Sequence, residues 1–400
     1  MLSQQAQEAL AQYQTGYSLP ASLYNDASVF EADTESLFLS GWFYACHISE
    51  IQNVGDFVVL NIANESVIVV RVSEDSVQAH LNVCRHRGSR VCLESHGNSK
   101  NFACPYHGWA YGLDGKLLVS KEMPAEFDKS AHGLKAAAVE IVFSMVFVNL
   151  DSNAGSLSKN AKRIEPQLSQ YGFEQTKVAY QETWTVEANW KLVLENFMEC
   201  YHCAPAHPEY ACSHSLKLPD RLSEKLYAPL QKRSQELGIN GEPVYSGETD
   251  DPLLAVFHHR QPLLDGYVTG TEDGKPVAPL LGSFAGYDGG AADIQLGLFF
   301  YGVMYPDHIV LYSFLPVDAK SSKMHIVWLV RDTAEQGRDY DVDKLTWLWR
   351  VTTDADKTII LNNQLGVNSR FYEPGPYSEM EKFTQMFVDW YVDELRDNRR

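Results

Sequence analysis

Two short segments of the chain each combine a cysteine with a histidine. Cys84 and His86 lie in "CRHRG", and Cys104 and His107 lie in "CPYHGW". Thiolates and imidazoles are common ligands of zinc and iron, and two of each suit a four-ligand metal centre. The pattern Cys-x-His followed by Cys-x-x-His therefore predicts a metal site built from two loops.

Two metal groups suit these four ligands. Zinc takes two cysteines and two histidines in a tetrahedron. A Rieske [2Fe–2S] cluster places two thiolates on one iron and two imidazoles on the other. Each loop offers one ligand of each kind, as an asymmetric cluster between two loops requires, and Gly88, Pro105 and Gly108 let backbone N–H groups approach the inorganic sulfides. We expect the iron–sulfur cluster, with structural zinc as the alternative.

A second group of potential ligands lies further along the chain, in "ENFMECYHCAPAH". His202 and His207 are five residues apart and can share one metal ion. A set of two histidines and one carboxylate leaves positions open on Fe(II) for O₂ and a substrate. We expect the carboxylate from "TDADKTIILNNQ", in the first turn of a helix, where Asp356 is the candidate and Asp354 its near competitor. Spacing alone does not separate the two.

Glu199 precedes His202 by three residues, which places it on the same face of a helix. An acidic side chain beside metal-bound imidazoles can orient a ring N–H and carry charge or protons. The run "VLENFMECYH" is too apolar for an exposed face, so we expect Glu199 to be functional.

Cys200 and Cys203 form a Cys-x-x-Cys pair, which is a weak redox or zinc motif because no thioredoxin-like strand precedes it.

The remaining cysteines and one pair of histidines are expected to be structural. Cys46, Cys92 and Cys212 have no matching partner, and we predict that they are small buried apolar side chains. His258 and His259 are predicted to lie solvated in a polar loop.

The elements that position the second group alternate between strand and helix patterns. Residues 177–189 read as a strand, and residues 189–202 as a helix that Pro205 and Pro208 end. Three antiparallel strand patterns follow from Leu296 onward, and two helical patterns complete the chain. These residues predict an antiparallel sheet flanked by helices.

The first group lies in a region of short strand patterns, from Trp42 to Asp151, that Gly, Asn and Asp separate as in a small barrel or sandwich. Residues 141–150 read as one buried strand, far shorter than the ~20 residues of a membrane-spanning helix. We predict an α+β protein in three parts. They are residues 1–40, a segment packing on the catalytic domain, residues 41–151, an all-β domain, and residues 152–400, the catalytic domain.

The composition excludes several other classes of protein. The 33 basic and 52 acidic residues among 400 give a net charge of −19, which disfavours nucleic acid and anionic membranes as partners. Seven cysteines form no disulfide framework, and the start of the chain has neither the basic segment nor the apolar core of a signal peptide. We expect a cytoplasmic protein.

Together these motifs resemble the α subunit of a Rieske-type non-heme iron oxygenase. The resemblance covers nearly the whole chain, through "NVCRHRGSRVC", "CPYHGWAYGLDGKL", "NWKLVLENFMECYH" and "DADKTIILNNQLGVNS", and is loose over 210–295. It implies a Rieske [2Fe–2S] domain followed by a catalytic domain with mononuclear iron. The family's third iron ligand is an aspartate eight residues before a glutamine, so Gln364 selects Asp356. A carboxylate three residues before the first iron histidine links one subunit's cluster to the next subunit's iron, and Glu199 matches it.

The resemblance also implies partners and an electron path. The chain has no Gly-rich dinucleotide motif. Electrons from NAD(P)H would therefore arrive through a separate flavin/iron–sulfur reductase or a ferredoxin. From the cluster they would pass through His86 or His107, then Glu199 and His202, to the iron of a neighbouring subunit in a homotrimer, with O₂ as co-substrate.

The glutamate at the linking position and the "ECYHC" run resemble the branch of choline monooxygenase and the glycine betaine, stachydrine and carnitine oxygenases. The resemblance implies hydroxylation and N-demethylation of a small quaternary ammonium compound, with ring hydroxylation of an aromatic acid as the alternative. Aromatic rings can hold such a cation. The candidates for a cage are Phe299, Phe300, Tyr301, Tyr305 and Tyr312, of which about half can face a pocket because alternate strand residues face opposite ways.

Overall fold

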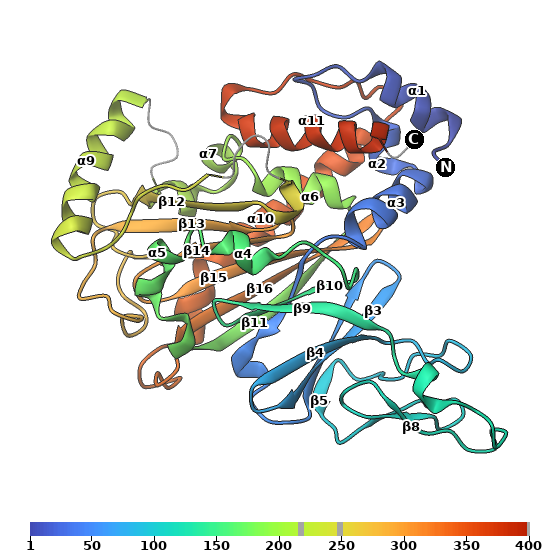
Figure 1. Ribbon diagram of the computed structural model, residues 1–400. Coiled ribbons are helices and arrows are strands. Elements are labelled where there is room, and N and C mark those ends of the chain that lie inside the picture. The colour runs from blue at the N-terminus through green and yellow to red at the C-terminus, as the bar shows by residue number, and fades with distance from the viewer. Residues whose placement is uncertain (215–219, 246–250, 398–400) are drawn as a thin grey trace.

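Three β-sheets form the framework on which both groups of candidate ligands are placed (Figure 1). The structure is a computed structural model, and it describes residues 1–214, 220–245 and 251–397. Neighbouring strands are antiparallel in every sheet of the described residues. The α+β class predicted from the sequence is confirmed.

Residues 43–149 form a seven-stranded sheet and a small three-stranded sheet. The strand order is β1-β10-β9-β4-β3-β2-β5 in the larger sheet and β6-β7-β8 in the smaller one. The strands are β1 Phe43–His47, β2 Asp56–Ile62, β3 Glu65–Ser73, β4 Ser76–Leu81, β5 His96–Asn98, β6 Phe102–Ala103, β7 Ala110–Tyr111, β8 Leu117–Val119, β9 Ala136–Val142 and β10 Met145–Asn149. The short 3₁₀ helices Ile48–Glu50 and Lys129–His132 lie in the connections.

The predicted single strand at residues 141–150 is a hairpin, so that prediction was wrong. Phe143 and Ser144 have φ angles of 49° and 60° and connect β9 to β10, in which Val142 pairs with Met145. Two consecutive left-handed residues form a turn whose twist matches that of antiparallel strands. The turn escaped detection because neither of its two residues, Phe143 and Ser144, is a Gly, Asn or Asp.

Residues 176–331 contribute a six-stranded sheet in the order β11-β16-β15-β14-β13-β12. Its strands are β11 Thr176–Val186, β12 Val256–Pro262, β13 Gly290–Leu296, β14 Phe300–Met304, β15 Ile309–Asp318 and β16 Ser321–Arg331. The sequence predicted β11, β14, β15 and β16. It did not predict β12 and β13, whose residues lie in the part of the chain where the family pattern is loose.

Each face of this sheet has its own apolar core. One face packs against α6 (Trp190–Phe197), α10 (Val342–Val367) and α11 (Lys382–Asp397). The opposite face packs against α4 (Leu157–Ala161), α5 (Glu165–Leu168) and strands of the first sheet. The remaining long helix, α9 (Asp220–Glu236), contacts β12 at the edge of the sheet. No helix in the described ranges is long and apolar enough to cross a membrane.

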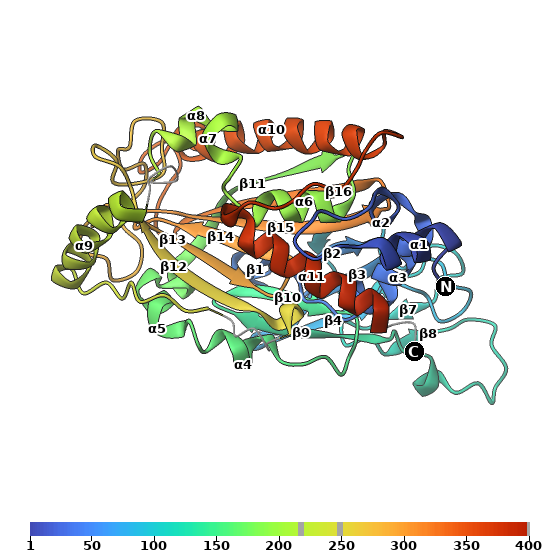
Figure 2. The same cartoon turned by 90° about the horizontal axis from the view of Figure 1, so that it is seen from above.

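The N-terminal segment contacts α6 and α11 (Figure 2). It consists of α1 (Gln4–Gln12), α2 (Ala21–Asn25), α3 (Ala27–Asp33) and a π-helical turn at Thr34–Phe38. Asp33 accepts a 2.8 Å hydrogen bond from Lys191 Nζ on α6, and both side chains are fully buried. The Tyr13 hydroxyl donates to Asp389 on α11 at 2.6 Å. Because a buried lysine or aspartate is costly without its partner, these contacts attach the segment to the helical layer.

The helix that leads to the second group of ligands ends earlier than predicted. It stops at Phe197, while Pro205 lies inside the short helix α7 (Cys203–Ala206) and Pro208 begins α8 (Pro208–Ala211). The Glu199 carboxylate accepts hydrogen bonds from the backbone N–H groups of Tyr201 and His202. These amides are therefore not available to continue the helix, and Glu199 and His202 share a turn rather than a helix face.

Candidate metal centres

The four ligands of the first group lie on two turns of the same design. The backbone N–H of Gly88 donates to the carbonyl of Cys84, and that of Gly108 donates to the carbonyl of Cys104, each at 3.0 Å. Both glycines have left-handed φ angles, 79° and 70°, which residues with side chains rarely adopt. A methyl group added to either glycine would meet no atom within 4 Å. The turns therefore face open space where a cluster would lie.

The sulfur and nitrogen ligands occupy different environments. Cys84 and Cys104 are buried, at 4% and 3% exposure, whereas His86 and His107 are exposed with ring centroids 4.6 Å apart. An asymmetric cluster with one inner and one outer iron fits this separation of thiolates from imidazoles. The Tyr111 hydroxyl lies 3.3 Å from the Cys84 sulfur, as expected of a group that tunes a cluster by hydrogen bonding. The residues present thus fit a Rieske cluster.

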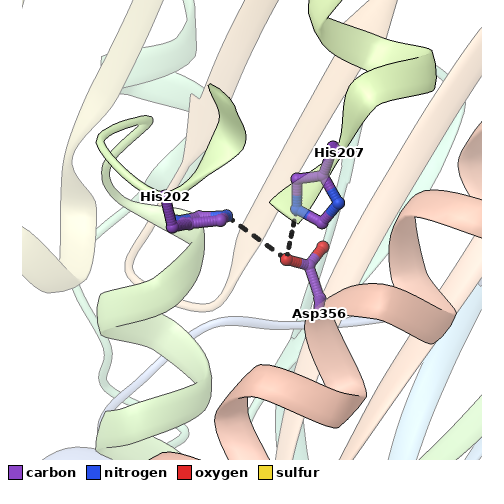
Figure 3. Close-up of side chains that lie close together, drawn as sticks. All are labelled: His202, His207 and Asp356. Atoms are coloured by element: carbon purple, nitrogen blue, oxygen red, sulfur yellow. Dashed lines mark hydrogen bonds and ion pairs between the residues drawn. The ribbon is translucent and has the colours of Figure 1, made fainter. Parts of the chain in front are cut away.

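The second group converges on one carboxylate oxygen (Figure 3). His207 Nε2 lies 2.9 Å and His202 Nε2 3.3 Å from Asp356 Oδ1. The three potential ligand atoms lie within 4.8 Å of one another. His202 comes from the turn after α6, His207 from the junction of α7 and α8, and Asp356 from the middle of α10 rather than from the first turn of a helix. Two imidazoles and one carboxylate at this spacing fit a mononuclear iron site.

The charges of the three side chains depend on one another. Burial alone would lower the pKa of His202, but hydrogen bonds with Asp356 and Glu199 raise it to about 9. Burial would raise the pKa of Asp356, but the two imidazoles hold it below its usual value. Positive charge is therefore favoured at the point where the three side chains meet, and a divalent cation supplies that charge when it binds there.

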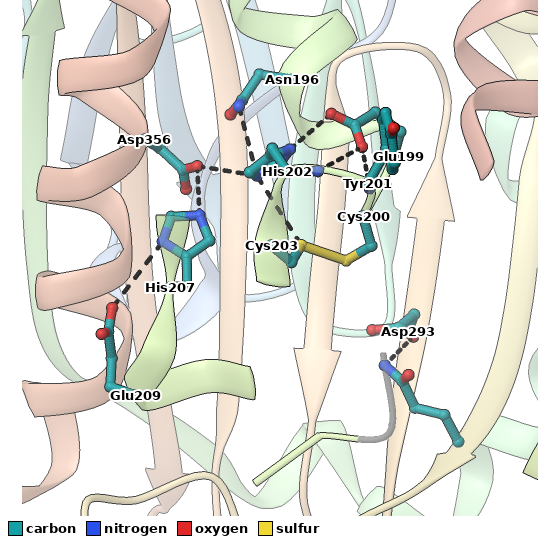
Figure 4. Close-up of a disulfide and its surroundings, with 11 residues drawn as sticks. Asn196, Glu199, Cys200, Tyr201, His202, Cys203, His207, Glu209, Asp293 and Asp356 are labelled. Atoms are coloured by element: carbon teal, nitrogen blue, oxygen red, sulfur yellow. Dashed lines mark hydrogen bonds and ion pairs between the residues drawn. A yellow bond between two sulfur atoms is a disulfide. The ribbon is translucent and has the colours of Figure 1, made fainter. Parts of the chain in front are cut away.

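Each imidazole also has a carboxylate near its other nitrogen (Figure 4). His202 Nδ1 lies 2.6 Å from Glu199 Oε1, and His207 Nδ1 lies 3.9 Å from Glu209 Oε1. Outer carboxylates of this kind orient metal-binding imidazoles and increase their basicity. Glu199 is 11% exposed. The sequence did not identify Glu209, although its position two residues after His207 was a usable signal.

The structure distinguishes the two candidate aspartates. Asp354 is exposed and accepts a 2.9 Å hydrogen bond from Trp184 Nε1, whereas Asp356 is 9% exposed and faces the histidines. The two point in different directions because two residues correspond to a rotation of about 200° on a helix.

Several expectations for the other cysteines and histidines need correction. Cys46 and Cys92 are buried as predicted, but Cys212 is exposed and its sulfur lies 3.3 Å from the Tyr267 hydroxyl. Cys200 and Cys203 form a disulfide beside His202 (Figure 4).

The pair His258 and His259 does not lie in a solvated loop, because both residues belong to β12. His258 is fully buried and His259 is half-buried. The prediction was wrong because the alternation of burial along β12 comes from its pairing with β13, which the local composition does not indicate.

The predicted aromatic cage is divided between the two faces of the sheet. Tyr301, Tyr305 and Tyr312 belong to the core on the face of the helices, while Phe300 belongs to the opposite core. Phe299 packs against Phe43, Phe38 and Trp190, in the interior.

Two aromatic residues on this helical face were not predicted. Trp349 lies two helical turns before Asp356 on α10, and its ring centroid is 5.3 Å from that of Tyr210. Tyr210 follows His207 by three residues. Both rings therefore lie beside the residues that converge on Asp356.

Comparisons with known proteins define the class of protein. Residues 41–133 match the family model described as the Rieske [2Fe-2S] domain, and residues 173–260 and 297–397 match that of the ring hydroxylating alpha subunit catalytic domain. A glycine betaine monooxygenase oxygenase subunit of Pseudomonas aeruginosa is 35% identical over 394 residues, covering 96% of this chain and 90% of the relative. The chain therefore belongs to the Rieske-type non-heme iron oxygenases, as an α (oxygenase) subunit.

Two further proteins are similar to the chain, one in part of its sequence and one in its fold. A carnitine monooxygenase oxygenase subunit of Escherichia coli K12 is 36% identical over 205 residues, which cover 50% of this chain and 54% of the relative. The crystal structure of the quaternary ammonium Rieske monooxygenase CntA with an inhibitor has a TM-score of 0.73 at 22% identity and covers 97% of this chain and 98% of that one. Because the sequence identity is only 22%, this similarity shows a shared fold and no more.

Family membership establishes the cofactors and the class of reaction. The enzyme is an oxidoreductase that carries a Rieske [2Fe–2S] cluster and mononuclear non-heme iron, uses O₂, and receives electrons that originate from NAD(P)H. It therefore works with an electron-transfer partner and a small-molecule substrate.

Proposed function

We propose that this chain is the terminal oxygenase component of a system that demethylates a small quaternary ammonium compound of the betaine type. The observation that carries the proposal is the 35% identity over nearly the whole chain to a glycine betaine monooxygenase oxygenase subunit. Hydroxylation of an N-methyl group would give a carbinolamine, which would lose formaldehyde. The overall reaction would consume O₂ and two electrons and release the amine with one methyl group fewer.

Each candidate ligand has a role in this proposal. Cys84, His86, Cys104 and His107 hold the cluster, and His202, His207 and Asp356 hold the iron. Iron bound by two histidines and one carboxylate supplies open positions for activating O₂ beside the substrate. Because Glu199 bonds to Nδ1 of His202, that ring keeps Nε2 directed at Asp356 while substrate enters. Asp356 is too buried for water to compete easily for its oxygens.

Glu199 is the proposed link between the two centres, and the link requires a second subunit. Its carboxylate contacts His202, on the side of that ring away from Asp356. Figures 1 and 2 show α7 well apart from β8, which belongs to the domain of the cluster ligands. Electrons from the exposed His86 or His107 of one chain would reach Glu199 of its neighbour in a homotrimer. A flavin/iron–sulfur reductase or a ferredoxin would reduce the cluster.

The domain boundaries and the location of the protein also remain predictions. We propose residues 41–151 as the Rieske domain and residues 152–400 as the catalytic domain, with residues 1–40 attached to the latter. The separate apolar core beneath the cluster ligands, which includes Phe57, Ile68, Trp109 and Tyr111, supports the first boundary. The predicted cytoplasmic location stays a prediction.

The test is a turnover screen with the full chain, loaded with both metals and reduced by a surrogate reductase with NADH. Methylated amines, with glycine betaine among them, form one arm, and benzoate-type aromatic acids form the other. We expect formaldehyde release coupled to O₂ consumption with at least one methylated amine. Turnover of an aromatic acid without any methylated amine would instead show that the same iron site serves ring hydroxylation.

A further inference from the structure

A partly buried carboxylate without a cation lies on the helical face of the six-stranded sheet. Asp293 is on β13, opposite His259 of β12 and Val303 of β14, and its side chain is half-buried. It accepts a hydrogen bond from Gln261 Nε2, at 2.7 Å. Burial raises the pKa of Asp293 to about 7, without an opposing contribution from any cation in the described part of the chain.

The other aspartates that are buried in the described ranges have basic partners. Asp33 is bonded to Lys191, Asp288 to Arg260, Asp307 to His308, and Asp356 to the two histidines. A carboxylate taken out of water without a cation is costly, and such groups persist where a ligand or a reaction uses them. Asp293 therefore differs from the carboxylates that stabilise the fold.

Aromatic side chains connect Asp293 to the residues that converge on Asp356. Burial is the main reason that the pKa of Tyr210 is raised, and the negative charges of Asp293 and, more weakly, of Asp356 add to it, which places Tyr210 within reach of both carboxylates. Tyr210 packs on His214, and His214 Nε2 lies 3.0 Å from the hydroxyl of Tyr305. Figure 4 draws Asp293 in the surroundings of the Cys200–Cys203 disulfide, on the side away from the three residues His202, His207 and Asp356.

We propose that Asp293 is the counter-ion of the substrate cation and, with the ring of Tyr210, determines the preference for a quaternary ammonium group. The inference rests on the proposed function and names the residues that would recognise its substrate. A quaternary ammonium nitrogen has no hydrogen to donate, so charge and aromatic faces are the means by which a protein can recognise it. Asp293 supplies the charge and Tyr210 supplies an aromatic face, whereas Tyr305 is fully buried and only supports His214.

The test compares two ligands that differ in one atom. Glycine betaine and 3,3-dimethylbutanoate share a carboxylate and three methyl groups, but the first has a charged nitrogen where the second has a carbon. Their dissociation constants are measured by calorimetry on the oxidised enzyme with both metals, at pH 8. Asp293→Asn should weaken glycine betaine at least tenfold and the carbon analogue less than threefold. Asp293→Glu should retain the preference for the cation.

Asp354→Asn is the matched control, because it removes one carboxylate of α10 that bonds to Trp184 and faces away from the site. It should leave both dissociation constants unchanged. Equal weakening of both ligands by Asp293→Asn would overturn the proposal, since a carboxylate that only maintains packing would affect them alike.

The pH dependence of the wild-type enzyme provides a second measurement if Asp293→Asn loses its metals. The titratable groups around Asp293 are His259 on β12, Tyr210 on α8, Tyr227 on α9, Tyr305 after β14 and Tyr171 after α5. Burial lowers the pKa of His259 and raises those of the four tyrosines, so these groups stay neutral near pH 7. A cation binds the ionised carboxylate, so affinity for glycine betaine should rise about tenfold from pH 6 to pH 8. A flat profile, or the same rise for the carbon analogue, would overturn the proposal.

The two proposals fail in different ways. If the wild-type enzyme converts aromatic acids and no methylated amine, the proposed function fails. If it demethylates glycine betaine while Asp293→Asn keeps the wild-type preference for the charged ligand, only the role of Asp293 fails.

Discussion

The imidazoles of His202 and His207 are oriented by neighbouring carboxylates. Their Nε2 atoms meet at Asp356, and their Nδ1 atoms face Glu199 and Glu209. The contacts with Glu199 and Asp356, at 2.6 to 3.3 Å, orient the rings before any metal arrives, whereas Glu209, at 3.9 Å, is too far from His207 Nδ1 for a hydrogen bond. Residue identity at Asp356 therefore matters more than the number of acidic residues nearby.

Asp356→Ala should remove the mononuclear iron, because two imidazoles alone leave the metal with neutral ligands and one contact fewer. We expect the iron that is not part of the cluster, measured by metal analysis, to fall below about a tenth of its wild-type amount. The visible absorption of the Rieske cluster should be unchanged. Asp354→Ala should keep its iron and lose only the hydrogen bond to Trp184, worth about 1 kcal/mol of stability. Iron loss in Asp354→Ala with retention in Asp356→Ala would reverse the assignment.

Tight turns and one short core position the four ligands of the cluster. Cys84 and Cys104 point into an apolar cluster of buried residues that also contains Trp109 and Tyr111, and the histidines remain outside it. This core is distinct from the two that cover the six-stranded sheet. Loss of the cluster should therefore disturb the turns without reaching α7 and α10.

Cys104→Ser in the full chain should abolish the visible absorption of the oxidised cluster and the EPR signal of the reduced one. The mononuclear iron should remain, because its ligands come from elements that belong to a different core. Turnover with a reductase should fall more than about a hundredfold, since the iron no longer receives electrons. Simultaneous loss of both metals would mean that the two domains do not fold independently of each other's metals.

At the scale of the whole molecule, the two centres lie in different parts of one chain. The cluster ligands belong to the domain of the first two sheets, and the iron ligands lie where α7, α8 and α10 meet (Figure 2). His86 and His107 are exposed in a single chain, although they are the proposed nitrogen ligands of the cluster. A neighbouring subunit that covers them would give the electrons a short path.

Mixed oligomers of Glu199→Gln and Cys104→Ser chains test this path. Glu199→Gln alone should keep both metals yet lose turnover, and Cys104→Ser alone should be inactive. In a mixed trimer, an intact cluster on one chain can face an intact Glu199 on its neighbour. Product formation should therefore recover to a few tenths of the wild-type rate, because only some neighbouring chains combine an intact cluster with an intact Glu199. Transfer within one chain predicts no recovery. Normal turnover of Glu199→Gln alone would contradict the linking role of this residue.

The sequence by itself determined the chemistry of both centres, because ligand type and local spacing are properties of short segments. Cys84 and His86 are held by one tight turn, and Cys104 and His107 by another, so their pattern is readable without the fold. The strands β14, β15 and β16 were also predictable, since each carries its own apolar pattern.

The tertiary structure decided what depends on residues that are distant in sequence. The choice of Asp356 needed either the family pattern or the direction of α10 relative to His207, 149 residues away. Asp293 and Tyr210 lacked any local signal, because their significance comes from β13 pairing with β12 and from α8 packing beside α10. A carboxylate on a strand looks like any solvated residue until the pairing of its neighbours buries it away from every cation. Burial and charge pairing depend on the whole fold, whereas the spacing of the ligands depends only on the local sequence.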